Sequence, residues 1–183
     1  VCSTGHEIIC GSLDGSIRNY DIRKGRILKV DFHHPVVSIS LSSDKDFLLA
    51  SCLDNTIRLV NTSTGELFSQ YSGHVCQRYT ISSCLDPSDS IIVSGSEDNR
   101  IYFWDLVNGS MMKQPQPGGV LHSINEHKGI VFCTRFHAES RMMLSTSSDA
   151  TVKVWSRLKA LELMLSHICL QEYHRIRVAS FSD

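Results

Sequence analysis

The sequence has no excess of charge of either sign and no long apolar run. Its 183 residues hold 18 Lys and Arg against 19 Asp and Glu, which gives a formal net charge of −1. Because so balanced a chain has no global field to attract phosphate backbones, we expect any RNA contact to be weak or indirect. Short, interrupted apolar runs predict no transmembrane span, and the N-terminal VCSTGHEIIC has no signal-peptide layout. No membrane partner is therefore expected.

The seven cysteines lack any C-x-x-C spacing and are odd in number. This argues against a disulfide framework and against a zinc knuckle, so reduced and mostly buried thiols of an intracellular protein are predicted. Among the nine histidines, His33 and His34 are adjacent, and neighbouring strand residues point to opposite faces, which is poor geometry for chelation. Nucleophile-elbow, H-E-x-x-H, Walker and dinucleotide motifs are absent. We predict no catalytic, cofactor-binding or metal-binding residue.

An internal repeat organises the chain instead. Small residues, an Asp and a β-branched or aromatic run recur in SLDGSIRNYD, CLDNTIRLVN, SEDNRIYFWD and SSDATVKVWS. The aspartates Asp14, Asp54, Asp98 and Asp149 are separated by 40, 44 and 51 residues, and an Ile or Val follows each at the third position. An apolar run precedes each Asp, so the pattern predicts a strand, a tight turn that contains the Asp, and a second strand.

A second turn follows in the first three units. Gly25, Gly65 and Gly109 each lie four residues after the end of the Asp-bearing motif, as expected for a turn that needs positive φ. A further strand is predicted after each Gly (RILKVDF, ELFSQYS, SMMKQ), and another precedes each unit from the second onward (VVSISLSS, YTISSCL, IVFCTRF). Four short strands in 40 to 50 residues, with no helical period, are typical of a β-propeller blade.

These motifs resemble those of the WD40-repeat family. In such a blade a His, a Ser or Thr, the turn Asp and a Trp can form a hydrogen-bonded relay that satisfies their buried polar atoms. The Asp-to-Trp spacing is therefore interpreted as structural, with partial or absent relays in the first two blades, where Tyr20 and Val60 replace Trp. The complete sets are His74, Ser94 or Ser96, Asp98 and Trp104, and His127, Ser145 or Ser147, Asp149 and Trp155.

The predicted fold is all-β: a WD40 β-propeller with about four blades of a seven-bladed ring. The blades are predicted at about 1–32, 33–72, 73–116 and 117–167, with propeller sequence clearest over 1–158. Residues 168–183 are interpreted as the start of a further blade or an atypical tail. Because an open stack exposes two sheet faces, and the sequence has no initial Met, we expect the chain to be a fragment of a longer protein.

Four segments narrow the resemblance to the WD repeat protein 83 family, also called the mitogen-activated protein kinase organizer family. They are CGSLDGSIRNYDIRKGR, SCLDNTIRLVNTSTGEL, YSGH and SGSEDNRIYFWDLVNG. The resemblance implies a non-catalytic scaffold that binds kinase-cascade and spliceosomal components in cytoplasm and nucleus. Two alternatives remain open: a propeller enzyme with a site on the axis, and a substrate receptor that recruits a catalytic partner.

A basic cluster in the first blade has two interpretations. It is either a solvated blade edge, which the recurrence of Arg58 and Lys153 at the repeat position of Arg18 favours, or a docking patch for an acidic segment or RNA phosphate. Its members are Arg18, Arg23, Lys24, Arg26 and Lys29.

Overall fold

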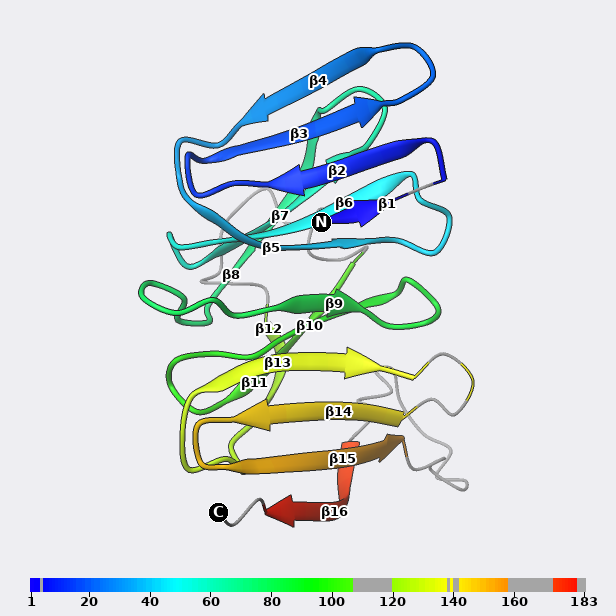
Figure 1. Cartoon of the computed structure of the whole chain (residues 1–183). Coiled ribbons are helices and arrows are strands. Elements are labelled where there is room, and N and C mark those ends of the chain that lie inside the picture. The colour runs from blue at the N-terminus through cyan, green and yellow to red at the C-terminus, as the bar shows by residue number, and fades with distance from the viewer. Residues whose placement is uncertain (4, 107–119, 138, 140–141, 158–172, 181–183) are drawn as a thin grey trace.

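A computed structural model shows four antiparallel sheets of four strands each (Figure 1). It describes residues 1–3, 5–106, 120–137, 139, 142–157 and 173–180. Each sheet is a meander in which consecutive strands are hydrogen-bonded neighbours, so each is one blade. The strands are β1 (Cys2–Ser3), β2 (Glu7–Gly11), β3 (Ser16–Asp21) and β4 (Arg26–Asp31) in blade 1; β5 (Val36–Leu41), β6 (Phe47–Cys52), β7 (Thr56–Asn61) and β8 (Leu67–Ser72) in blade 2; β9 (Ser83–Leu85), β10 (Ile91–Ser94), β11 (Ile101–Asp105) and β12 (Val120–Ile124) in blade 3; and β13 (Val131–Phe136), β14 (Met142–Ser147), β15 (Thr151–Arg157) and β16 (Tyr173–Ser180) in blade 4.

The four blades follow one another as a stack, from blade 1 (blue) to blade 4 (yellow to red) in Figure 1. The first strands of successive blades contact each other: β1 lies against β5, β5 against β9, and β9 against β13. This is the arrangement of propeller blades around an axis, with the first strand of each blade innermost. The predicted all-β class, with four blades of a propeller, is confirmed.

The apolar core is divided among the three interfaces between blades. The interface of blades 3 and 4 holds Val93 and Trp155, that of blades 2 and 3 holds Leu49 and Trp104, and that of blades 1 and 2 is centred on Ile9. Both tryptophans are at most 1% exposed. A single blade is only one sheet thick, so the neighbour on each side supplies the apolar surface that stabilises it.

The blades were predicted at about 1–32, 33–72, 73–116 and 117–167. Sheets 1 and 2 extend over 2–31 and 36–72, whereas blade 3 extends to Ile124 and blade 4 begins at Val131. Strand β16, in the segment predicted to open a further blade, pairs antiparallel with β15 and is the outer strand of blade 4. The predicted strand SMMKQ and Gly109 lie outside the described residues.

The turns of the repeat have the expected left-handed residues. Gly25 and Gly65 have φ values of 60° and 75°. After each turn Asp the chain also takes positive φ, even where the residue has a side chain, as at Ala150 with φ of 59°. This conformation is strained for Ala, so the geometry of the turn outweighs the preference of Ala for negative φ.

Candidate functional site

One edge of the stack collects the features that the repeat predicts. Along this edge, which we call the rim, the second strand of each blade turns into the third and the chain passes from one blade to the next; it lies on the left in Figure 1. The turn aspartates Asp14, Asp54, Asp98 and Asp149 all belong to it. The rim is therefore the place where both relays and exposed loops meet.

In blade 4 the relay is closed. The ring of His127 lies between Asp149 and Ser145, with Nδ1 3.0 Å from the Asp149 Oδ2 and Nε2 2.7 Å from the Ser145 Oγ. Trp155 Nε1 donates to the same Ser145 Oγ over 2.8 Å. His127 and Ser145 are buried, so each contact replaces one that water would otherwise supply.

The order of donors in this relay follows from chemistry. The Ser145 Oγ already accepts from the indole of Trp155, and its own proton can be donated to His127 Nε2, which leaves Nδ1–H to donate to the Asp149 carboxylate. Burial alone would raise the pKa of Asp149, but hydrogen bonds from Thr151, Lys128 and His127 outweigh it and hold that pKa well below its ordinary value. The carboxylate is thus a fixed anion that orients the imidazole.

Two serines were candidates for this relay, and they have different contacts. Ser145 binds His127 and Trp155, whereas the Ser147 Oγ donates to the Gly129 carbonyl over 2.9 Å and accepts from the Asp149 amide. Ser147 therefore connects the turn that contains Asp149 with the loop that contains Gly129, and does not belong to the relay.

The residue two positions after each turn Asp also takes part in these networks, although the sequence pattern did not single it out. In three blades this residue is Ser or Thr, and its hydroxyl donates to the carboxylate over 2.5 to 2.6 Å. The hydroxyl holds one carboxylate oxygen and leaves the other for a partner. Its recurrence in the aligned repeats was the available signal: Ser16, Thr56 and Thr151.

In blade 3 the predicted relay is not formed. Neither ring nitrogen of the buried His74 has a hydrogen-bond partner among the described residues, and its ring lies edge-on to Trp104 at 5.4 Å between centroids. Trp104 Nε1 donates to the backbone carbonyl of Ser72 in blade 2, and the Ser94 Oγ donates to its neighbouring carbonyl at Gly95. Burial lowers the pKa of His74 to about 4.

The competing partner of Asp98 is a tyrosine. The Tyr102 hydroxyl donates to Asp98 Oδ2 over 2.6 Å, and the position that holds Thr151 in blade 4 is Arg100, which has no hydroxyl. The carboxylate therefore accepts from Tyr102, and His74 has no hydrogen bond to it. The other predicted serine, Ser96, accepts from the Val75 amide over 3.0 Å and holds the loop before blade 3.

Blades 1 and 2 replace the relay with an ion pair. In blade 2 Asp54 lies 2.5 Å from the Arg58 guanidinium, with both side chains at most 14% exposed, and the guanidinium also lies over the Phe32 ring. Burial opposes ionisation of Asp54, but the hydrogen bonds from Arg58 outweigh it and lower the pKa of that carboxyl. Blade 1 has the same pair, Asp14 and Arg18 at 2.6 Å, in a more exposed form.

The predicted basic docking patch is divided and largely neutralised. Arg18 and Lys29 are cross-strand partners, but they pair with Asp14 at 2.6 Å and with Asp31 at 3.4 Å, respectively. Lys24 lies 3.6 Å from Asp21 in the next turn. Strand alternation places Arg26 on the opposite face of the sheet from Lys29, and Arg23 lies in the turn before it. The predicted patch is thus divided between the Arg18–Lys29 cross-strand pair and three residues at the turn from β3 to β4, Arg23, Lys24 and Arg26.

The described residues hold no group of three or more His, Cys, Asp or Glu that could bind a metal ion. Over the same residues no helix is long and apolar enough to cross a membrane. The six cysteines described are free thiols, and Cys52, Cys76 and Cys84 are buried. Burial raises the pKa of each of these three to about 11, so they are protonated at neutral pH.

A family model described as "WD domain, G-beta repeat" matches residues 25–61, 65–105 and 118–156, more than half of the chain. Each match includes the outer strand of one blade and three strands of the next, so the sequence repeat overlaps two blades. The chain belongs to the WD40-repeat family, whose members typically act as protein-interaction scaffolds.

Within that family it is similar to WD repeat domain-containing protein 83. It is 41% identical to the Rattus norvegicus protein over 123 residues, 67% of this chain and 39% of the rat protein, and the Homo sapiens protein gives the same values. It is 32% identical to the Dictyostelium discoideum homolog over 151 residues, 82% of this chain and 44% of that one. The chain spans less than half the length of these relatives, which belong to a generally non-catalytic family.

Proposed function

We propose that the chain is part of a scaffold that binds other proteins through loops of its rim. The observation that carries this proposal is the loop before blade 3. The Glu97 Oε1 accepts backbone N–H groups of Gln77, Arg78 and Tyr79 over 2.6, 2.7 and 3.2 Å, which fixes the loop. Both Arg78 and Tyr79 remain exposed, and Tyr79 also leans edge-on against Phe132 of blade 4.

A fixed loop of this kind suits protein recognition. Tyr and Arg supply much of the binding energy in protein interfaces, and a loop that is ordered before binding loses less entropy on association. The resemblance to the WD repeat protein 83 family supports kinase-cascade and spliceosomal proteins as partners, and with them a location in cytoplasm and nucleus.

The test is affinity purification of the tagged chain from cell extract with quantitative mass spectrometry. We expect kinase-cascade or splicing components to be recovered with the unchanged chain and to fall at least fivefold with Tyr79→Ala. Arg23→Glu, in the turn of blade 1, is the matched control and is expected to retain them. Equal recovery with both variants, or recovery of neither class of partner, would contradict the proposal.

A further inference from the structure

The loop before blade 3 begins at a buried histidine that has no hydrogen bond. His74 is 2% exposed, and neither of its ring nitrogens has a partner among the described residues. Its counterpart in blade 4, His127, has partners on both sides of the ring. A buried polar group without a partner costs free energy, so His74 would be stabilised by any arrangement that supplies one.

The other side chains of the predicted relay are present in blade 3 but are hydrogen-bonded elsewhere. The Ser94 Oγ donates to the Gly95 carbonyl and Trp104 Nε1 donates to the Ser72 carbonyl, each over 3.0 Å. The rings of His74 and Trp104 lie edge-on, with 5.4 Å between their centroids. Blade 3 therefore has the components of a closed relay in an open arrangement.

Two carboxylates lie near enough to His74 to act on its charge. Burial lowers the pKa of His74 to about 4, and the negative charges of Asp98 and Asp54 oppose this shift. Asp54 is paired with Arg58 at 2.5 Å. Asp98 is therefore the carboxylate that can become a partner of the His74 ring.

The Asp98 carboxylate is held by fewer hydrogen bonds than its counterpart in blade 4. It accepts from the Tyr102 hydroxyl over 2.6 Å and from the Arg100 amide over 3.2 Å. Asp149 accepts from a histidine, from two backbone amides and from the Thr151 hydroxyl. Arg100 has no hydroxyl to take the place of Thr151, so a turn of the Asp98 carboxylate away from Tyr102 breaks a single side-chain hydrogen bond.

Tyr102 occupies a repeat position that is basic in the other blades. In blade 4 the residue at this position, Lys153, donates to the Glu126 carbonyl and leaves Asp149 to His127. In blades 1 and 2 the residue pairs with the turn Asp itself. The residue four positions after the turn Asp therefore determines whether the carboxylate is available to a histidine. Its three basic members are Arg18, Arg58 and Lys153.

His74 is also joined directly to the loop that exposes Tyr79. The next residue, Val75, donates its amide to the Ser96 Oγ over 3.0 Å, and its carbonyl accepts from the Glu97 amide over 2.9 Å. Glu97 in turn holds the backbone of the loop as far as Tyr79. A hydrogen bond to the His74 ring would therefore fix the residue at which this loop begins.

We propose that Tyr102 and His74 compete for the Asp98 carboxylate, so that blade 3 exchanges between its open arrangement and a closed relay of the blade 4 type. In the closed relay His74 Nδ1 donates to Asp98, and the Ser94 hydroxyl donates to His74 Nε2. Closure fastens the start of the loop before blade 3. The inference rests on the proposed function, because a partner that binds the fastened loop more tightly favours the closed relay.

The test is proton NMR of the imidazole N–H groups, which become visible when a buried hydrogen bond protects them from exchange with water. The unchanged chain should show one such signal, from His127. Tyr102→Phe removes the competing hydroxyl and keeps the ring that stacks on Trp104, so a second signal is expected, and it should disappear when His74→Phe is added. Hydrogen exchange of the amides of residues 75–80 should slow at least threefold in Tyr102→Phe.

Tyr71→Phe is the matched control. It removes another phenol hydroxyl of the same interface, one that donates to the Leu106 carbonyl, and it should lower the melting temperature without a second imidazole signal. Tyr102→Phe combined with Arg100→Thr reproduces two features of blade 4 and should give the second signal as well.

Absence of the second signal from both the single and the combined Tyr102 variants would overturn the inference, and so would two signals in the unchanged chain. A closed relay in Tyr102→Phe together with full partner recovery by Tyr79→Ala refutes the proposed function alone. An unchanged His74 in Tyr102→Phe, with partners lost by Tyr79→Ala, refutes this inference alone.

Discussion

Replacement of Asp149 by Ala tests the relay of blade 4. The carboxylate accepts from His127 Nδ1, from the Lys128 amide and from both the amide and the hydroxyl of Thr151. Its removal leaves a donor on the buried His127 unpaired, which costs about 1–3 kcal/mol, and further loses hydrogen bonds to a charged group. We expect a loss of about 3 kcal/mol, or a melting temperature lower by about 6–12 °C for a chain of this size.

The matched comparison is Asp98→Ala, one repeat earlier. Asp98 accepts from Tyr102 and from the Arg100 amide but not from a buried histidine, so a loss of about 1 kcal/mol is expected. Thermal unfolding followed by circular dichroism, with urea titration as a second measurement, separates the two. If Asp98→Ala costs as much as Asp149→Ala, the assignment of the closed relay to blade 4 alone is wrong.

Further predictions concern other members of the rim. The pKa of His74 is lower in the folded than in the unfolded state, so the stability that neutral His74 contributes is lost as the pH falls from about 6.5 to about 4. With His74→Phe, the midpoint of urea unfolding should therefore change less over that pH range than in the unchanged chain. Arg58→Met leaves Asp54 nearly buried without its cation and should cost about 3 kcal/mol in chemical denaturation; no change would show that the pair is dispensable. Ala150→Gly places a residue without Cβ at the positive φ and should raise the melting temperature by a few degrees. A lower melting temperature would show that Ala150 is not strained there.

Much of the fold could be predicted because the repeat is local. The turn aspartates, Gly25 and Gly65 have short-range signatures, and the strands around them follow in fixed order, so the strands on either side of each turn could be predicted from the sequence. The outer strand of blade 4 could not be predicted in this way. It lies after residues 158–172, beyond the regular spacing of the earlier blades, and only its pairing with β15 identifies it.

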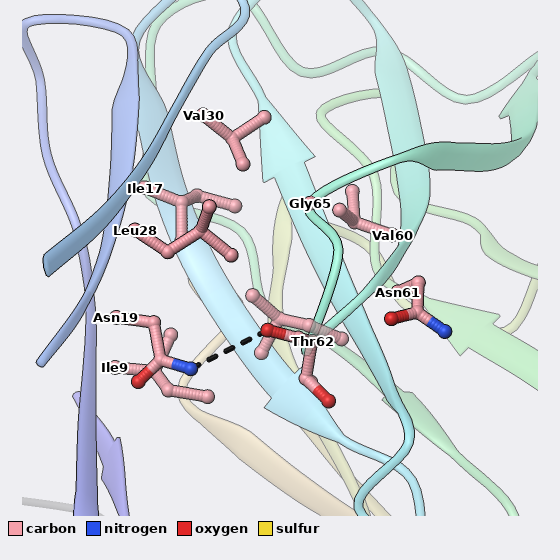
Figure 2. A pocket seen from close by; sticks show the side chains of 10 residues that line it. Ile9, Ile17, Asn19, Leu28, Val30, Val60, Asn61, Thr62 and Gly65 are labelled. Carbon is pink, nitrogen blue, oxygen red and sulfur yellow. Dashed lines mark hydrogen bonds between the residues drawn. The ribbon is translucent and has the colours of Figure 1, made fainter. Parts of the chain in front are cut away.

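The relay was predictable in one blade and not in the other for a physical reason. Trp104 has the same spacing from Asp98 as Trp155 has from Asp149, but the Asp98 carboxylate accepts from Tyr102, and His74 has no hydrogen-bond partner among the described residues. The sequence shows Val60 in place of Trp in blade 2, and only the structure shows that Asn19 of blade 1 lies near it (Figure 2).

Buried turn networks stabilise the blades, while exposed loops are proposed to bind partners. The most direct test measures melting temperature and partner recovery together for Asp149→Ala and Tyr79→Ala. We expect Asp149→Ala to lower the melting temperature and the recovery of all partners in parallel. We expect Tyr79→Ala to remove partners at an unchanged melting temperature. Selective loss of one partner by Asp149→Ala, with its melting temperature unchanged, would show that Asp149 contacts a partner directly instead of stabilising the blade.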